Sequence, residues 1–144
     1  DTGGGVHLDL FHEIDYISWL FGTPIKSSST LRSVSSLDID AIDYANYLLE
    51  YDSFTVCIVL NYYRRDPKRS IEIIFENETW TIDLIDNIIR GENESVIYEN
   101  VASPISNTYY DQMEYYLDHL KSNKKPMNSL EESLKVLKIC LVNE

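Results

Sequence analysis

Basic residues are scarce in this sequence, and their scarcity excludes two classes of partner. The 144 residues hold 12 Lys and Arg against 24 Asp and Glu, which gives a formal net charge of −12. Such a chain repels the phosphates of nucleic acids and the surface of anionic membranes, and it has no basic stripe to offset this. We therefore expect neither nucleic acid nor a membrane among its partners.

Cysteine is rare as well, which argues against a disulfide-stabilised secreted fold. The two cysteines, Cys57 and Cys140, lie in the apolar stretches TVCIVL and KICLV, where a buried free thiol is the usual state. No apolar run approaches the roughly 18 residues of a membrane-spanning helix, and neither a signal peptide nor an initiator methionine opens the sequence. We expect a cytoplasmic chain that is part of a longer one.

Glycine is sparse, and its placement does not fit a dinucleotide-binding turn. Gly3, Gly4 and Gly5 are consecutive and are followed by VHL, while Gly22 and Gly91 stand alone. The chain therefore has no GxGxxG after a strand, the pattern whose backbone approaches the diphosphate of NAD. We expect no cofactor-binding residue in this chain.

Alternating apolar residues predict strands in the middle of the sequence. A period of two is clear in FTVCIVLNYY at 54–63, SIEIIFE at 70–76 and TWTIDLI at 79–85. Weaker patterns predict strands at 27–36, 43–51 and 95–100. Short links join the segments, which favours an antiparallel or mixed sheet of five or six strands and an α+β fold.

Three apolar residues interrupt the polar sides of the predicted strands: Val59, Ile74 and Ile85. Because an apolar surface is seldom left in water over a large area, we expect part of that sheet face to be covered by a second copy of the chain.

Helical spacing predicts two helices near the end of the chain. The apolar stripe of the first consists of Tyr109, Met113, Tyr116, Leu117 and Leu120, and that of the second of Leu130, Leu134, Leu137 and Leu141. We expect the first stripe to lie in the core. Ser129 and Glu132 have the spacing of a capping box, which begins the second helix.

The opening stretch DTGGGVHLDLFHEIDYISWLFG predicts one helix after the three glycines. Its apolar side consists of Leu10, Phe11, Ile14, Ile17 and Phe21, and its polar side of Asp9, His12 and Tyr16. Asp9 and His12 are three residues apart and can project from one turn, where the glycines leave room for another molecule. The residues alone leave two interpretations open, a solvated surface or a ligand-binding face.

A metal site is a weaker interpretation of the same stretch. It would draw on His7, Asp9, His12 and Glu13, but HEIDY lacks the second histidine of HExxH. We expect no metal.

The stretch GGGVHLDLFHEIDYISWLFG resembles the motif that opens the C-terminal domain of the glucose–fructose oxidoreductase, inositol dehydrogenase and rhizopine-catabolism (Gfo/Idh/MocA) family. The match includes Asp9, His12, Asp15, Trp19 and Gly22. Many relatives have three residues between the aspartate and the histidine, whereas this chain has two. The segments LNYYRRDPKRSIEIIFENETWTIDL and SLEESLKVLKICL extend the resemblance over most of the chain.

The resemblance implies that residues 1–144 form one substrate-binding and oligomerisation domain, an open sheet with helices on one face, like that of glyceraldehyde-3-phosphate dehydrogenase. It implies an NAD(P)-dependent oxidoreductase acting on a sugar, a sugar derivative or a cyclitol, and a homodimer or tetramer formed through the sheet. NAD or NADP would bind an N-terminal Rossmann domain, so we expect this chain to be inactive alone. The alternative is a non-catalytic sugar-binding or oligomerisation module.

The resemblance also implies roles for individual residues. His12 would be the acid/base or hydroxyl-orienting residue, and Asp9 would bind the substrate or fix the imidazole. A carbinol proton must leave as hydride departs, and a histidine can accept it. Asp15 lies away from Asp9 on the helical wheel, and we expect it to have a structural partner. Further candidates for substrate binding are Tyr16, Arg64 and Arg69, the arginines through a carboxylate or phosphate.

Overall fold

The computed structural model describes residues 4–100 and 105–141, which fall into two compact units. The first unit comprises residues 1–64 and 127–144, and the second residues 65–126. The described elements of the first are α1 (Val6–Asp9), α2 (His12–Phe21), β1 (Lys26–Arg32), β2 (Tyr44–Glu50), β3 (Thr55–Asn61) and α4 (Leu130–Leu141). Those of the second are β4 (Ser70–Ile74), β5 (Thr79–Asp83), β6 (Ile88–Arg90), η1 (Glu92–Glu94), β7 (Val96–Glu99) and α3 (Ile105–Ser122).

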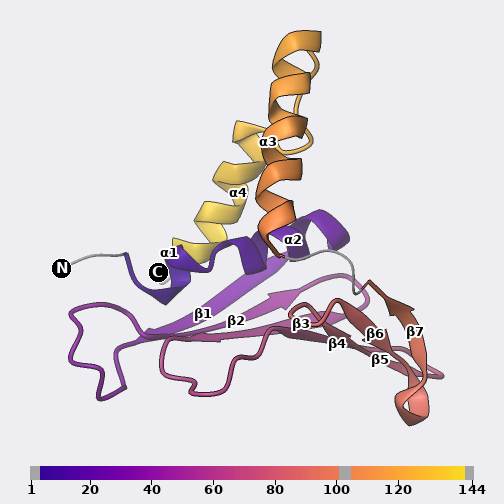
Figure 1. Cartoon of the computed structure of the whole chain (residues 1–144). Coiled ribbons are helices and arrows are strands. Elements are labelled where there is room, and N and C mark those ends of the chain that lie inside the picture. The colour runs from indigo at the N-terminus through magenta and orange to yellow at the C-terminus, as the bar shows by residue number, and fades with distance from the viewer. Residues whose placement is uncertain (1–3, 101–104, 142–144) are drawn as a thin grey trace. The chain divides into compact units, whose positions relative to one another are not determined.

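The first unit is an antiparallel sheet in the order β1-β2-β3 with helices on one face. Figure 1 shows α1, α2 and the lower end of α4 over this sheet. A tight turn joins β2 to β3, in which the Tyr51 N–H donates to the Phe54 carbonyl at 2.9 Å. The α+β class and the pairing of these two strands are confirmed.

The core of the first unit follows the predicted alternation. In β2 the buried residues are Ala45, Tyr47 and Leu49, and in β3 they are Ile58 and Leu60. Val59 is exposed on the opposite side of β3, as predicted. Cys57 shares that exposed side, so the prediction of a buried thiol there is wrong, whereas Cys140 is buried as predicted.

The second unit is an antiparallel sheet in the order β4-β5-β6-β7. Its register places Ile71 opposite Ile82 and Ile73 opposite Trp80. The three-residue strand β6 was not predicted, since it is too short to show a period. Ile85 was predicted in a strand but lies in the turn before β6, where Asn87 has a φ of 54°.

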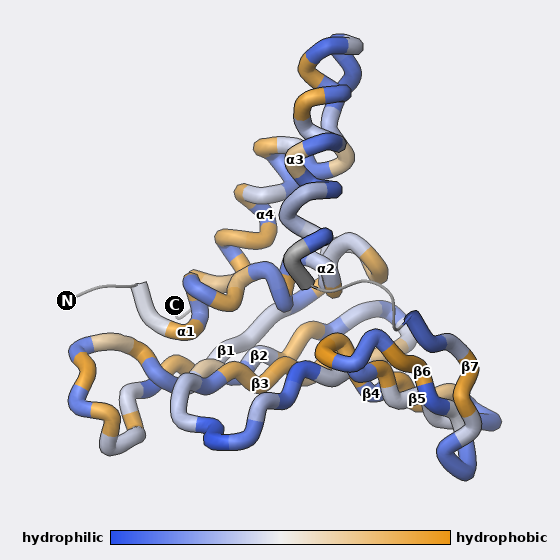
Figure 2. The backbone as a smooth tube through the Cα atoms, viewed as in Figure 1, coloured by the Kyte–Doolittle hydropathy of each residue, from blue (hydrophilic) through white to orange (hydrophobic). Residues whose placement is uncertain are grey.

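The apolar stripe of α3 is exposed, so its prediction as core is wrong. This holds for Tyr109, Met113, Tyr116, Leu117 and Leu120. Figure 2 shows hydrophobic and hydrophilic residues alternating along α3. Helical spacing therefore located an apolar face correctly but could not say whether the rest of the chain covers it.

The buried face of α4 consists of Val136, Ile139 and Cys140. The predicted leucine stripe is exposed at Leu130, Leu134, Leu137 and Leu141. Apolar residues occupy two faces of this helix, and the period alone does not choose between them. The capping box is confirmed, because the Ser129 N–H donates to Glu132 at 2.7 Å and the Glu132 N–H donates to the Ser129 hydroxyl at 3.2 Å.

Candidate functional site at the junction of two short helices

The stretch that was predicted as one helix is two helices. Helix α1 ends at Asp9 and α2 begins at His12, with Leu10 at φ −107° and ψ 23° between them. Ile14 and Ile17 are buried as predicted, whereas Phe11 and Phe21 are partly exposed, at 41% and 37% of their surface. Asp9 and His12 therefore stand on different elements, and the helical wheel does not relate their side chains.

The glycine run packs against its own chain. Gly5 has a φ of +94°, and a Cβ atom there would lie 2.9 Å from the carbonyl oxygen of Ile42. The next residue, Val6, donates its N–H to that same oxygen at 2.8 Å. We expected the glycines to admit another molecule, but Gly5 instead admits the main chain of Ile42. Gly3 lies outside the described residues.

Asp9 is exposed at the end of α1 and accepts a hydrogen bond from Tyr62. The donor is the phenolic hydroxyl of a half-buried residue that directly follows β3. Burial and the bond to Asp9 raise the pKa of Tyr62 to about 12, so the phenol stays protonated near neutral pH. Sequence reasoning missed this pair because its members are 53 residues apart.

His12 has a different partner, the side chain of Glu13. The Nε2 atom of His12 lies 3.0 Å from Oε1 of Glu13, and the imidazole is about half exposed. The other carboxylate oxygen, Oε2, accepts a hydrogen bond of 2.5 Å from the hydroxyl of Tyr16. When the carboxylate of Glu13 accepts a hydrogen bond from Nε2–H, Nδ1 of a neutral imidazole is left as the acceptor. In the structure the imidazole of His12 therefore contacts Glu13, whereas the resemblance implied Asp9 as the residue that fixes it.

His7 is the one histidine near the site that is buried, with 7% of its surface exposed. Burial lowers the pKa of its imidazole, and the nearby Asp9 opposes this effect. A neutral His7 fits its buried position at the start of α1. We assign it to the packing of α1 rather than to the site.

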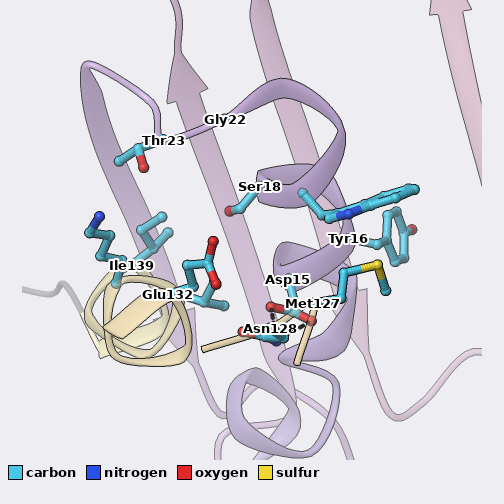
Figure 3. Close-up of a pocket in the computed structure, with 12 residues that line it drawn as sticks. Asp15, Tyr16, Ser18, Gly22, Thr23, Met127, Asn128, Glu132 and Ile139 are labelled. Atoms are coloured by element: carbon cyan, nitrogen blue, oxygen red, sulfur yellow. Dashed lines mark hydrogen bonds between the residues drawn. The ribbon is translucent and has the colours of Figure 1, made fainter. Parts of the chain in front are cut away.

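Asp15 has the structural partner that we expected. It accepts two hydrogen bonds from the side-chain amide of Asn128, at 3.3 and 3.4 Å, and so ties α2 to the segment that begins α4. Figure 3 shows these two side chains facing each other beside a pocket.

A pocket of about 390 Å³ lies between α2 and α4. Ser18 and Glu132 project toward it from the two helices (Figure 3). Tyr16 lines it, as do apolar residues that include Trp19, Val136 and Ile139. Asp9 and His12 are absent from the lining of the pocket, so the pocket and the polar groups at the α1–α2 junction are separate features.

The two arginines predicted to bind substrate belong to different units. Arg64 is the last residue of this part of the first unit, and its N–H donates to the side chain of Asn61 at 2.9 Å. Arg69 directly precedes β4 in the second unit, where its carbonyl accepts from the Leu84 N–H at 2.9 Å. Their role in substrate binding stays a prediction.

The described residues do not fit a dinucleotide. A diphosphate needs a glycine turn whose N–H groups are open to it, but Gly5 is filled by Ile42 and Gly4 by Leu8. Within residues 4–100 and 105–141, no three His, Cys, Asp or Glu side chains are grouped to hold a metal ion. What the junction offers is a carboxylate, an imidazole and their supporting phenols, groups that bind a hydroxyl and move its proton.

None of the helices in the described part of the chain has the length and apolar character needed to cross a membrane.

Comparison with known proteins places this geometry in context. Residues 1–81 match the GFO/IDH/MocA C-terminal domain. No curated protein sequence is significantly similar to the chain.

Three solved structures with a similar fold are a dehydrogenase, an oxidoreductase and a reductase, each 16 or 17% identical to the chain. UDP-N-acetylglucosamine 3-dehydrogenase GnnA from Acidithiobacillus ferrooxidans is 16% identical with a TM-score of 0.76, over 94% of this chain and 44% of that chain. An oxidoreductase from Agrobacterium radiobacter, in complex with NAD+, L-tartaric acid and magnesium, is 17% identical with a TM-score of 0.74, over 90% and 43%. Biliverdin reductase from Synechocystis, in complex with biliverdin and NADP+, is 17% identical with a TM-score of 0.67, over 90% and 42%. The chain thus spans less than half the length of these structures.

Proposed function

Because the chain belongs to the GFO/IDH/MocA C-terminal domain family, we propose that it is the substrate-binding part of an NAD(P)-dependent oxidoreductase. The substrate class that we propose is a sugar, sugar derivative or cyclitol with a hydroxyl or carbonyl group to be oxidised or reduced. NAD or NADP would be held by an N-terminal Rossmann domain, since the described residues offer no cradle for it. We expect this chain to be inactive alone and the whole protein to be cytoplasmic.

The observation that carries the proposal is the placing of two polar pairs at the α1–α2 junction. Asp9 with Tyr62 and His12 with Glu13 stand on either side of the two-residue link, and both Asp9 and His12 are exposed. Neighbouring acceptors of this kind suit a polyhydroxylated substrate, in which one group orients a hydroxyl and another takes its proton.

The roles that we propose for His12 and Asp9 follow from their hydrogen-bonding partners. His12 accepts the proton of the reacting hydroxyl at Nδ1, while Glu13 holds Nε2 at 3.0 Å. Asp9 accepts a hydrogen bond from a substrate hydroxyl and thereby orients the molecule. Tyr16, Arg64 and Arg69 are the further substrate-binding residues of the proposal.

The activity is tested in the full-length protein that contains this chain. Reduction of NAD+ and NADP+ is followed by absorbance with glucose, UDP-N-acetylglucosamine and myo-inositol as substrates. His12→Ala should lower turnover by about 10²- to 10⁴-fold, as expected for loss of a general acid or base. His119→Ala, in α3 of the second unit, is the control and should leave turnover unchanged. Near-normal turnover of His12→Ala, or turnover by the isolated chain, would contradict the proposal.

A second candidate function is a non-catalytic sugar-binding or oligomerisation module. The observation that favours it is the exposure of Leu48 and Val59 on the face of the first sheet opposite its core, and of Ile74 in β4. We propose that the exposed face of the β1-β2-β3 sheet forms a homodimer or tetramer interface, whether or not the protein is catalytic. Light scattering of the wild type and of Val59→Lys tests this, since the charge should weaken association. Binding of a sugar without any reduction of NAD+ or NADP+ would favour the module over the enzyme.

A further inference from the structure

We infer that Tyr62 is a positioning residue that fixes the carboxylate of Asp9 for substrate binding. This inference rests on the proposed function, because it assigns a task to a residue that acts through Asp9. The residue roles that the resemblance implies do not include Tyr62, although the resembling segment LNYYRRDPKRSIEIIFENETWTIDL contains it.

The main chain of Tyr62 is held by a contact that is independent of the bond to Asp9. Its N–H donates to the carbonyl oxygen of Asp43 at 3.0 Å, although Tyr62 lies just beyond the end of β3. Asp43 is itself buried and immobilised, because its carboxylate accepts the N–H groups of Val34 and Ser35 at 2.8 and 2.9 Å. The side chain of Tyr62 is therefore attached to a main chain that hydrogen bonds hold in place.

The other end of α1 is tied to the same segment of chain. Val6, the first residue of α1, donates its N–H to Ile42, the neighbour of Asp43. Asp9, the last residue of α1, receives the hydroxyl of Tyr62. The main chain at residues 42 and 43 thus holds both the start of α1 and the main chain of Tyr62. The hydrogen bond from the phenol of Tyr62 to Asp9 then connects Tyr62 to the end of α1. A four-residue helix is too short to hold its last side chain by itself.

The phenol fixes the direction of this bond near neutral pH. Since Tyr62 keeps its proton, it donates, and Asp9 receives the bond at Oδ2. The remaining oxygen, Oδ1, is the one that we assign to a substrate hydroxyl. A fixed carboxylate loses less freedom when the substrate binds, and displacement of such a group by about 1 Å can lower the rate by about 10²-fold.

Tyr62→Phe removes the hydroxyl and keeps the ring, so it tests the inference in the full-length protein. The assay is the one above, with whichever of glucose, UDP-N-acetylglucosamine or myo-inositol is turned over. We expect kcat to fall by about 10- to 100-fold, with a smaller change in KM. Tyr51→Phe is the matched control, because Tyr51 also follows a strand and donates its hydroxyl, to the Gly22 carbonyl at 3.1 Å, but has no bond to Asp9. Its kcat should stay within about twofold of wild type.

A double-mutant cycle separates positioning from a general loss of structure. If Tyr62 acts through Asp9, adding Tyr62→Phe to Asp9→Asn should change kcat by less than about twofold. Thermal unfolding checks that the variants are folded, and Tyr62→Met replaces Tyr62→Phe if the latter is not.

The outcomes of this experiment are distinguishable. Loss of activity in Asp9→Asn with an unchanged kcat in Tyr62→Phe would overturn the positioning role and leave the proposed function standing. Independent, multiplicative losses in the two variants would overturn it as well. No turnover with any of the three substrates would remove the proposed function, and this inference with it.

Discussion

The phenolic hydroxyl of Tyr47 donates a hydrogen bond of 3.1 Å to the main-chain carbonyl oxygen of Cys140 and so joins β2 to α4 inside the core. Both residues are fully buried, and burial raises the pKa of Tyr47 well above its usual range. Tyr47→Phe would leave the Cys140 carbonyl without this donor in a place closed to water.

We expect Tyr47→Phe to lower the free energy of unfolding by about 1 to 2 kcal/mol, the usual cost of a buried polar group that loses its partner. Urea denaturation measures this. Tyr51→Phe is the control, since it removes a hydrogen bond of equal length at an exposed site, and we expect a change of less than about 0.5 kcal/mol. Equal losses of unfolding free energy in the two variants would show that burial does not make the Tyr47 hydrogen bond more stabilising than an exposed one.

Gly5→Ala should destabilise the protein more than Gly22→Ala. Both glycines have a positive φ, +94° and +81°, with an extended ψ, a combination that costs other residues about 1 to 3 kcal/mol. A Cβ at Gly5 would also meet the Ile42 carbonyl at 2.9 Å, whereas nothing lies within 4 Å at Gly22. We expect the loss of unfolding free energy at Gly5 to be larger by at least about 1 kcal/mol, as measured by urea denaturation. A larger loss at Gly22 would contradict the contact with Ile42.

The stability of the protein should fall as the pH drops through the ordinary pKa of histidine, 6.5, because of His7. Burial lowers the pKa of His7 in the folded state, so below 6.5 the unfolded chain binds a proton that the folded chain refuses. The contribution of His7 is complete above 6.5 and is lost as the pH falls toward its folded-state pKa. The slope contributed by one such group is at most about 1.4 kcal/mol per pH unit.

Urea denaturation at several pH values measures this dependence. His7→Gln should flatten the curve between about pH 5 and about pH 7, whatever its effect at neutral pH. An unchanged slope in His7→Gln would assign the pH dependence to other groups.

Ser129→Ala should remove the cap of α4. Ser129 donates its N–H to Glu132 and accepts the Glu132 N–H in return, and we expect a loss of about 1 kcal/mol. Ser133→Ala, one turn further along, loses a hydrogen bond to the Asn128 side chain at 3.1 Å but gains helix propensity, so its effect should be within about 0.5 kcal/mol. Thermal unfolding distinguishes the two variants.

Local patterns predicted what is decided locally. The β2–β3 hairpin and the capping box at Ser129 depend on neighbours in the sequence, and the structure has both. Alternation assigned Ile58 and Leu60 to the core, because one face of β3 is covered by helices.

The sequence-based predictions are wrong where contacts between residues far apart in the sequence determine the structure. Nothing in Leu10 or Phe11 disfavours a helix, yet α1 is held at its two ends by Ile42 and Tyr62 and ends at Asp9. The sequence indicated Asp9 and His12 as a pair, but it could not show that each has its own partner. The second apolar face of α4 was likewise invisible to a search for one period.

The two-residue link between α1 and α2 allows the distance between Asp9 and His12 to change without loss of the core. In a continuous helix, one inserted residue would turn every following side chain by about 100° and would move Ile14 and Ile17 out of the core. Here an insertion after Leu10 lengthens a turn, while α2 keeps its orientation through those two buried residues. The spacing between Asp9 and His12 can therefore differ by one residue between relatives without loss of the core.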